Sequence, residues 1–129
     1  VGLTLSAEAT VELAAAVGFD GVDIAIRDLL ESGVSPNHLR ARMDFHELRG
    51  GAWPLPVDWR ASADRYHHDL RRLPRYAQAA SVLGCLATGT WVLPEIPAPG
   101  PGERPDSHRL RWVEWHVRRL QPVARILHD

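Results

Sequence analysis

Apolar and polar positions along the chain follow two periods, one typical of strands and one typical of helices. Four short apolar or β-branched runs predict strands, at 1–5, 21–26, 47–53 and 85–91. Longer segments with apolar residues every three or four positions predict helices, at 7–17, 36–45, 61–83 and from 106 or 107 onward. This strand–helix order, repeated four times, predicts parallel strands joined by helical crossovers.

Residues with helix-terminating chemistry support these boundaries. Ser6 is a suitable N-cap for the first helix, and Gly18 is a suitable C-cap. Proline at the first helical position, in Ser35-Pro36, opens the second helix. Gly84 ends the third helix, and Pro74 inside it predicts a kink or a break.

The two longest helices each predict a buried apolar stripe. In the third helix the stripe comprises Tyr66, Leu70, Leu73, Ala77 and Ala80. In the last helix it comprises Leu110, Val113, Val117, Leu120, Ala124 and Leu127. Each set recurs at helical spacing, so we expect both stripes to face a core.

A long loop follows the fourth predicted strand. Residues 92–105 contain five prolines, whereas the turns that enter the strands are short. Loops after the carboxyl ends of parallel strands build ligand sites in β/α folds. We therefore expect any ligand at that end of the sheet, although a stiff flap without a ligand role is the alternative.

Composition and charge exclude several classes of protein. A chain of 129 residues is long enough for one domain with a core. Its net charge is −1 and its 15 basic residues are interspersed with acids, so we expect no nucleic-acid partner. It has no apolar run of membrane-spanning length, so we expect no membrane partner. The single cysteine, Cys85, excludes an internal disulfide and favours a cytoplasmic location.

The second predicted strand offers the first candidate ligand residues. Because side chains alternate along a strand, Asp23, Ala25 and Arg27 share one face, which would point into a barrel. Arg27 at the strand's end would clamp a phosphate or carboxylate through two hydrogen bonds. A structural ion pair between Asp23 and Arg27 is the alternative.

The ends of strands three and four offer the remaining candidates. Trp53 and Trp91 occupy matching positions and would form an apolar wall for a sugar ring, or else simply shield the core. Thr90 would offer a hydroxyl, and Glu95 is a candidate general base. None of the seven histidines is four residues from another, so the sequence predicts no metal site.

Four stretches in the same order resemble the N-terminal half of the sugar phosphate isomerase/epimerase family, at residues 3–40, 50–60, 83–94 and 116–127. The resemblance implies a xylose-isomerase-like TIM barrel, with eight strands and eight helices. It also implies a divalent metal (Mn, Mg, Co or Zn) at the barrel mouth. The ligands of that metal come mainly from strands five to eight, so no cofactor is expected within this chain.

The expected fold is therefore α/β, with residues 1–129 forming a single parallel (βα)4 half of a TIM barrel. Such a half is either a fragment of a (βα)8 barrel or a half-barrel that forms a homodimer, because its edge strands would otherwise lack partners. The resemblance implies isomerisation or epimerisation of a small sugar or sugar phosphate. In that reaction this chain would supply the substrate-binding residues. A non-catalytic binding or assembly module is the alternative, and an endonuclease is disfavoured by the lack of a basic stripe.

Overall fold

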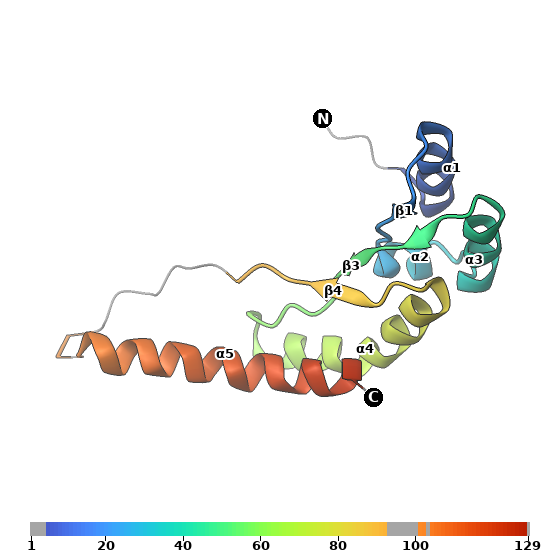
Figure 1. Ribbon diagram of the computed structural model, residues 1–129. Coiled ribbons are helices and arrows are strands. Elements are labelled where there is room, and N and C mark those ends of the chain that lie inside the picture. Colours follow the sequence, from blue (N-terminus) through green and yellow to red (C-terminus); the bar gives the residue numbers. More distant parts are fainter. Residues whose placement is uncertain (1–4, 93–100, 103, 129) are drawn as a thin grey trace. The chain divides into compact units, whose positions relative to one another are not determined.

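A computed structural model describes residues 5–92, 101, 102 and 104–128 of the chain (Figure 1). The helices are α1 (Ala7–Val17), α2 (Ile26–Glu31), α3 (Pro36–Phe45), α4 (Ala63–Leu83) and α5 (Pro105–His128). The strands are β1 (Gly21–Val22), β2 (Arg49–Gly50), β3 (Ala52–Pro54) and β4 (Ala87–Gly89). Glu95 and most of the strand predicted at 1–5 lie outside the described residues.

The described residues group into two compact units. The first comprises the described residues up to Pro56 together with Pro74–Thr90. The second comprises Val57–Leu73 and the described residues from Trp91 onward. The helix α4 contributes to both units, which divide at Pro74 within it. None of the described helices has the length and apolarity needed to cross a membrane.

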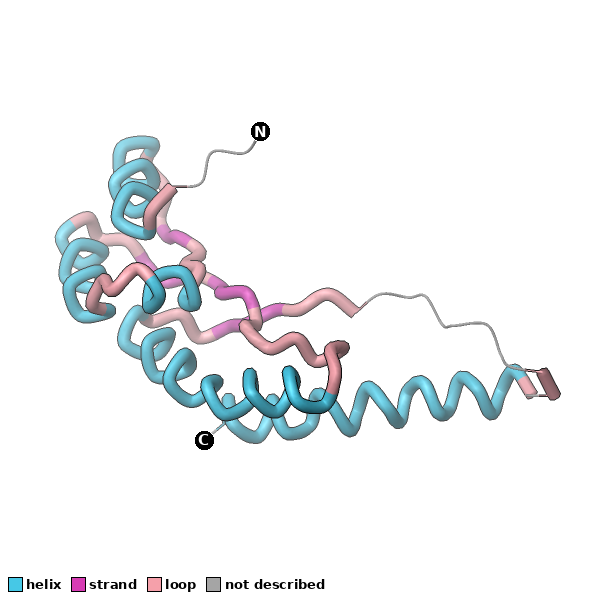
Figure 2. The backbone as a smooth tube through the Cα atoms, turned by 180° about the vertical axis from the view of Figure 1, so that it is seen from behind, coloured by secondary structure: helices cyan, strands magenta, loops and turns pink. Residues whose placement is uncertain are grey.

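The strands of the first unit pair in parallel, as the sequence predicts. Val22 of β1 lies opposite Gly50 of β2, and Trp53 of β3 lies opposite Thr88 of β4. A backbone hydrogen bond of 3.2 Å from the Ile24 amide to the Ala52 carbonyl extends the first pairing past β1. In Figure 2 the paired strands are short segments within longer connections. The fold is therefore α/β, with short parallel strands and helical crossovers.

The strand predicted over 21–26 is too long. It ends at Val22, and Ile26 begins the short helix α2, which the sequence analysis missed. Ile26 and Leu29 lie three positions apart and are each 1% exposed, so a single helical turn buries both. A short apolar run is compatible with both the strand period and the helix period. Here the helix forms because it buries both Ile26 and Leu29.

One face of the paired strands is buried and the other is exposed. Ile24 is 1% exposed and Trp53 is 4% exposed, so both belong to the core. Asp23, Ala25 and Ala52 alternate with them in sequence and are exposed. This alternation is the one predicted for residues 22–26, although only the first residue of that segment, Val22, is in a strand.

The predicted helix ends are confirmed in detail. The Ser6 hydroxyl accepts a hydrogen bond of 3.1 Å from the Ala9 amide. Gly18 adopts a left-handed φ of 85° as it ends α1. Pro36 occupies the first turn of α3, and Pro74 lies inside α4 without ending it. Local capping chemistry thus places the helices within a few residues of their predicted bounds.

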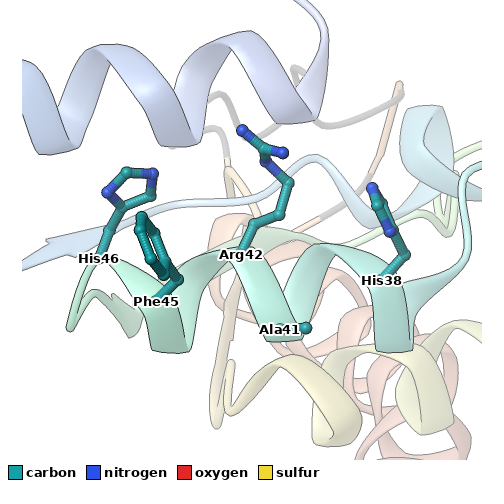
Figure 3. A pocket seen from close by; sticks show the side chains of 5 residues that line it. All are labelled: His38, Ala41, Arg42, Phe45 and His46. Carbon is teal, nitrogen blue, oxygen red and sulfur yellow. The ribbon is translucent and has the colours of Figure 1, made fainter.

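The helices α1 and α3 are joined by a row of ion pairs. Figure 3 shows His38, Arg42 and His46 pointing from the same side of α3. Across from them on α1, Glu12 pairs with both Arg42 and His46, the latter at 3.2 Å. The side-chain hydrogen bond from Arg42 is the main reason that the pKa of Glu12 is lowered from its ordinary value of 4.5.

This lowered pKa predicts an acid-sensitive contribution to stability. A carboxyl group with a depressed pKa stabilises the fold above its ordinary pKa, and the stabilisation is lost as pH falls through the lowered value. Thermal melts of the wild type and Glu12→Gln should therefore differ most near neutral pH and converge as the pH falls below 4.5. Glu114→Gln is the matched control, since Glu114 and Arg118 are 3.9 Å apart and largely exposed. A Glu12→Gln difference that is constant with pH would contradict the prediction.

The second unit is built around aromatic contacts between α5 and the segment 57–73. The Tyr66 hydroxyl donates a hydrogen bond of 2.7 Å to the Arg119 carbonyl. The Arg119 guanidinium lies 4.5 Å from the centre of the Tyr66 ring. Trp59, which is 2% exposed, lies 4.9 Å from the His116 ring, measured between ring centroids. These contacts fix which side of α5 is buried.

Four of the six positions in the stripe predicted for α5 are exposed, namely Leu110, Val113, Val117 and Ala124. Leu110, Val113 and Val117 are 65%, 50% and 54% exposed. The less exposed positions are instead Trp112, His116, Arg119 and Val123. These four residues also recur at helical spacing, but only Val123 is aliphatic. A prediction based on aliphatic residues therefore selects the adjacent row of α5, which contains Leu110, Val113 and Val117. The broad rings and the apolar stem of arginine cover more surface than valine does.

Candidate functional site

The candidate site lies in the first unit, at the carboxyl end of β1. There the chain leaves β1 at Val22, and α1 begins nearby after Ser6. A cavity of about 420 Å³ opens between these segments and α2. Its polar lining consists of two carboxylates and three hydroxyls, from Asp23, Asp28, Ser6, Thr10 and Ser32. A volume of this order is typical of small-molecule sites.

Among the predicted site residues that the structure describes, only Asp23 lines this cavity. Its Oδ1 accepts a hydrogen bond of 2.7 Å from the Ala52 amide, which is next to the break between β2 and β3. Its Oδ2 has no hydrogen-bond partner among the described residues. Asp23 therefore has a structural role through Oδ1 and also lines the cavity.

Arg27 is not in the place predicted for it. It lies in the first turn of α2 rather than at the end of a strand. Its guanidinium donates a hydrogen bond to the Pro56 carbonyl and does not line the cavity. No ion pair joins Arg27 to Asp23 among the described residues. Sequence spacing could not show the contact with Pro56, which is 29 positions away.

The two predicted tryptophans differ in burial. Trp53 is 4% exposed, and its carbonyl accepts a hydrogen bond of 2.9 Å from the Thr88 hydroxyl. The Trp53 ring is thus part of the core and has almost no surface for a ligand. Trp91 is 85% exposed and belongs to the second unit, whereas Thr90 ends the first.

Sequence analysis missed Asp28 and the three hydroxyl residues of the cavity. Asp28 lies in the first turn of α2, so the failure to predict this helix also hid the carboxylate. Ser6 was recognised only as a helix cap, a role that it does have. A useful signal would have been that Ser6 and Asp28 both follow the ends of predicted strands.

The described residues do not fit the divalent metal that the family resemblance implies. Among them, no three histidine, cysteine, aspartate or glutamate side chains gather as a metal site requires. Cys85 is 3% exposed, and burial raises the pKa of its thiol above its ordinary value. Such a thiol is a poor nucleophile and a poor metal ligand, in agreement with its predicted core role.

Comparison with solved structures identifies the fold. The chain is similar to a xylose isomerase domain protein from Alicyclobacillus acidocaldarius subsp. acidocaldarius, with a TM-score of 0.70 and 22% sequence identity. The match covers 91% of this chain but only 39% of that one. The fold is thus part of a xylose-isomerase-like TIM barrel, and the predicted fold class is confirmed. No protein-family model matches the sequence, and no curated protein matches it.

Proposed function

We propose that this chain supplies sugar-binding residues to an isomerase or epimerase with a xylose-isomerase-like barrel. The observation that carries the proposal is the cavity at the carboxyl end of β1, where Asp23 and Asp28 meet three hydroxyl groups. Parallel β/α folds bind their ligands at this end of the strands. The similarity to a xylose isomerase domain protein supports a sugar as the ligand.

The role assigned to this chain is to bind and orient the substrate. Isomerisation and epimerisation require a proton to leave a carbon next to a carbonyl group, which a metal ion usually polarises. The described residues provide no ligand set for such a metal, so we assign none of them to that step. Carboxylate oxygens at Asp23 and Asp28 accept hydrogen bonds from sugar hydroxyls and would fix the position of the ring.

Titration of the ¹⁵N-labelled chain with xylose, followed by amide NMR shifts, tests this proposal. Saturable shifts are expected for amides around the cavity, including Ala25, Asp28 and Ser32. Amides near Gly18 and Gly84, at the other end of the strands, serve as the internal control. No saturable shift at millimolar sugar, or shifts centred on Gly18 and Gly84, would overturn the proposal.

A second candidate function is an assembly module that binds another protein surface, including a second copy of the chain. The observation that favours it is the exposure of Leu110, Val113 and Val117 at helical spacing on α5, at 65%, 50% and 54%. A contiguous row of exposed apolar side chains is typical of surfaces that bind a partner. The same NMR samples distinguish the two functions, since self-association broadens signals with protein concentration and without sugar.

A further inference from the structure

The helix α5 carries an apolar row that is exposed along its length. The helix is continuous over 24 residues (Figure 1). Leu110, Val117 and Ala124 follow one another at intervals of seven residues, and all three are exposed. Val113 lies between the first two and is 50% exposed. Because seven residues make about two helical turns, these four side chains form one row, the apolar row of α5.

A row of arginines runs beside the apolar row. Arg111, Arg118 and Arg125 also follow one another at intervals of seven residues, and all three are exposed. Each of them directly follows a member of the apolar row in the sequence, so the two rows lie about 100° apart around the helix. The exposed side of α5 is therefore apolar along one margin and cationic along the other.

Little acidic charge offsets these arginines. The helix α5 contains five arginines and two acidic residues, a net charge of +3 with its histidines neutral, whereas the whole chain carries −1. Glu114 lies 3.9 Å from Arg118, and the two side chains are 63% and 82% exposed. An ion pair this long and this exposed contributes little, so a partner's carboxylate can replace it at small cost.

The aromatic residues of α5 indicate that the exposed rows face a helix rather than a lipid surface. Trp115 lies 5.9 Å from Trp59, and Trp112 lies 3.8 Å from His116, measured between ring centroids. The two tryptophans of α5, the residues best suited to anchor it in a lipid interface, are thus engaged within the chain. The apolar row is narrow and aliphatic, and a repeat of seven residues is the spacing that packs against a second helix.

A second copy of α5 does not match the two rows. In a twofold dimer, the arginine row of one copy meets either the arginine row or the apolar row of the other, because both copies carry the same rows. The first arrangement brings like charges together, and the second leaves the guanidinium groups without carboxylates. A matching partner must bring a row of acidic residues, which α5 lacks.

We infer that the exposed side of α5 binds an amphipathic helix of another protein whose apolar face is flanked by glutamate or aspartate. The apolar row packs against the apolar face of that helix. Arg111, Arg118 and Arg125 pair with the carboxylates along its flank. The inference rests on the second function proposed above, assembly, and names its partner class. It does not depend on sugar binding.

Fluorescence anisotropy of a labelled, designed helical peptide, titrated with the full chain, tests the inference. The peptide has leucine at the apolar positions of its heptads and glutamate along one flank, and a second peptide has lysine in place of glutamate. We expect the glutamate peptide to bind about tenfold or more tightly than the lysine peptide at low ionic strength, and its affinity to fall as salt is added.

Variants in each row show where the peptide binds. Val117→Ser in the apolar row and Arg118→Glu in the arginine row should each weaken binding of the glutamate peptide by about three- to tenfold. Both positions are exposed, so circular dichroism should show both variants folded. Arg71→Glu is the matched control, since it makes the same change of charge at an exposed position on α4 in the same unit. It should leave the affinity unchanged.

Each contrary outcome overturns the inference in a different way. Equal binding of the two peptides, or equal losses in Arg71→Glu and Arg118→Glu, would show that the arginine row does not select a partner. Binding to phosphatidylserine vesicles that Val117→Ser abolishes, without binding of the glutamate peptide, would make this a lipid-binding surface. Self-association that Val117→Ser abolishes, measured by sedimentation, would make the occupant a second copy. Sugar binding is measured separately with xylose, so it stands or fails independently of these results.

Discussion

Replacing Gly50 by alanine is expected to lower the free energy of unfolding by about 3 kcal/mol, at the upper end of the usual cost of overpacking. A Cβ at this position would lie 2.8 Å from the Gly84 carbonyl carbon and 2.9 Å from the Cys85 amide nitrogen, and closer still to the Leu83 carbonyl oxygen. All three atoms belong to the backbone, so no side-chain rotation relieves the clash. Urea denaturation followed by circular dichroism would measure the loss.

Gly89→Ala is the matched control for this variant. Gly89 ends β4 in the same unit, and a Cβ there meets no atom within 4 Å among the described residues. Its backbone does not adopt a positive φ, so alanine is free of strain and should change stability by less than about 1 kcal/mol. Equal losses in the two variants would show that the close approach of Gly50 to the chain entering β4 is not what stabilises this unit.

Asp69→Ala is expected to destabilise the second unit by about 2–3 kcal/mol, the range for losing a hydrogen bond to a buried charged group. Asp69 is 2% exposed, and its Oδ2 accepts a hydrogen bond of 3.0 Å from the Asp58 amide. Arg65 lies 3.5 Å from the same oxygen, but its side chain is 56% exposed, so that ion pair adds little. Differential scanning calorimetry would measure the change.

Two variants locate the source of that loss. Asp64→Ala removes an exposed carboxylate from the first turn of the same helix and should cost only about 0.3–1 kcal/mol. Asp69→Asn retains a side-chain oxygen as acceptor and should recover part of the stability that alanine loses. If Asp64→Ala proves as damaging as Asp69→Ala, the hydrogen bond to Asp58 is not the important interaction.

Features fixed by a few neighbouring residues could be predicted from the sequence. The Ser6 cap, the left-handed Gly18 and the span of α4 each depend on residues within one or two helical turns. Parallel pairing followed from the order of the elements, because a helix between strands returns the chain in the same direction. The α/β fold class rests on that order of elements, whereas the xylose-isomerase-like barrel is what the family resemblance of four ordered stretches implies. The structural match bears both out.

Features that depend on distant contacts could not be predicted. Arg27 donates a hydrogen bond to the carbonyl of Pro56, which is 29 positions away in the sequence. Asp23 accepts one from the amide of Ala52, which is also 29 positions away. The buried side of α5 depends on Trp59 and Tyr66, which lie outside that helix. Apolar spacing on α5 allows two overlapping stripes, and only the partner residues decide between them. Asp23 was a predicted site residue and lines the cavity, and its role toward a ligand stays a prediction, whereas Asp28 emerged only with the structure.

The hydrogen bond from Ala52 to Asp23 also constrains how this chain can evolve. Where β2 gives way to β3, a side-chain oxygen occupies the place that a main-chain carbonyl takes elsewhere in the sheet. A substitution at position 23 keeps this hydrogen bond only if the new side chain has an acceptor oxygen at the same distance from the backbone. Asparagine is the uncharged residue that meets this condition. In the proposed sugar site, a change at position 23 is therefore coupled to the alignment of the strands, whereas a change at position 28 does not disturb the hydrogen bond to Ala52.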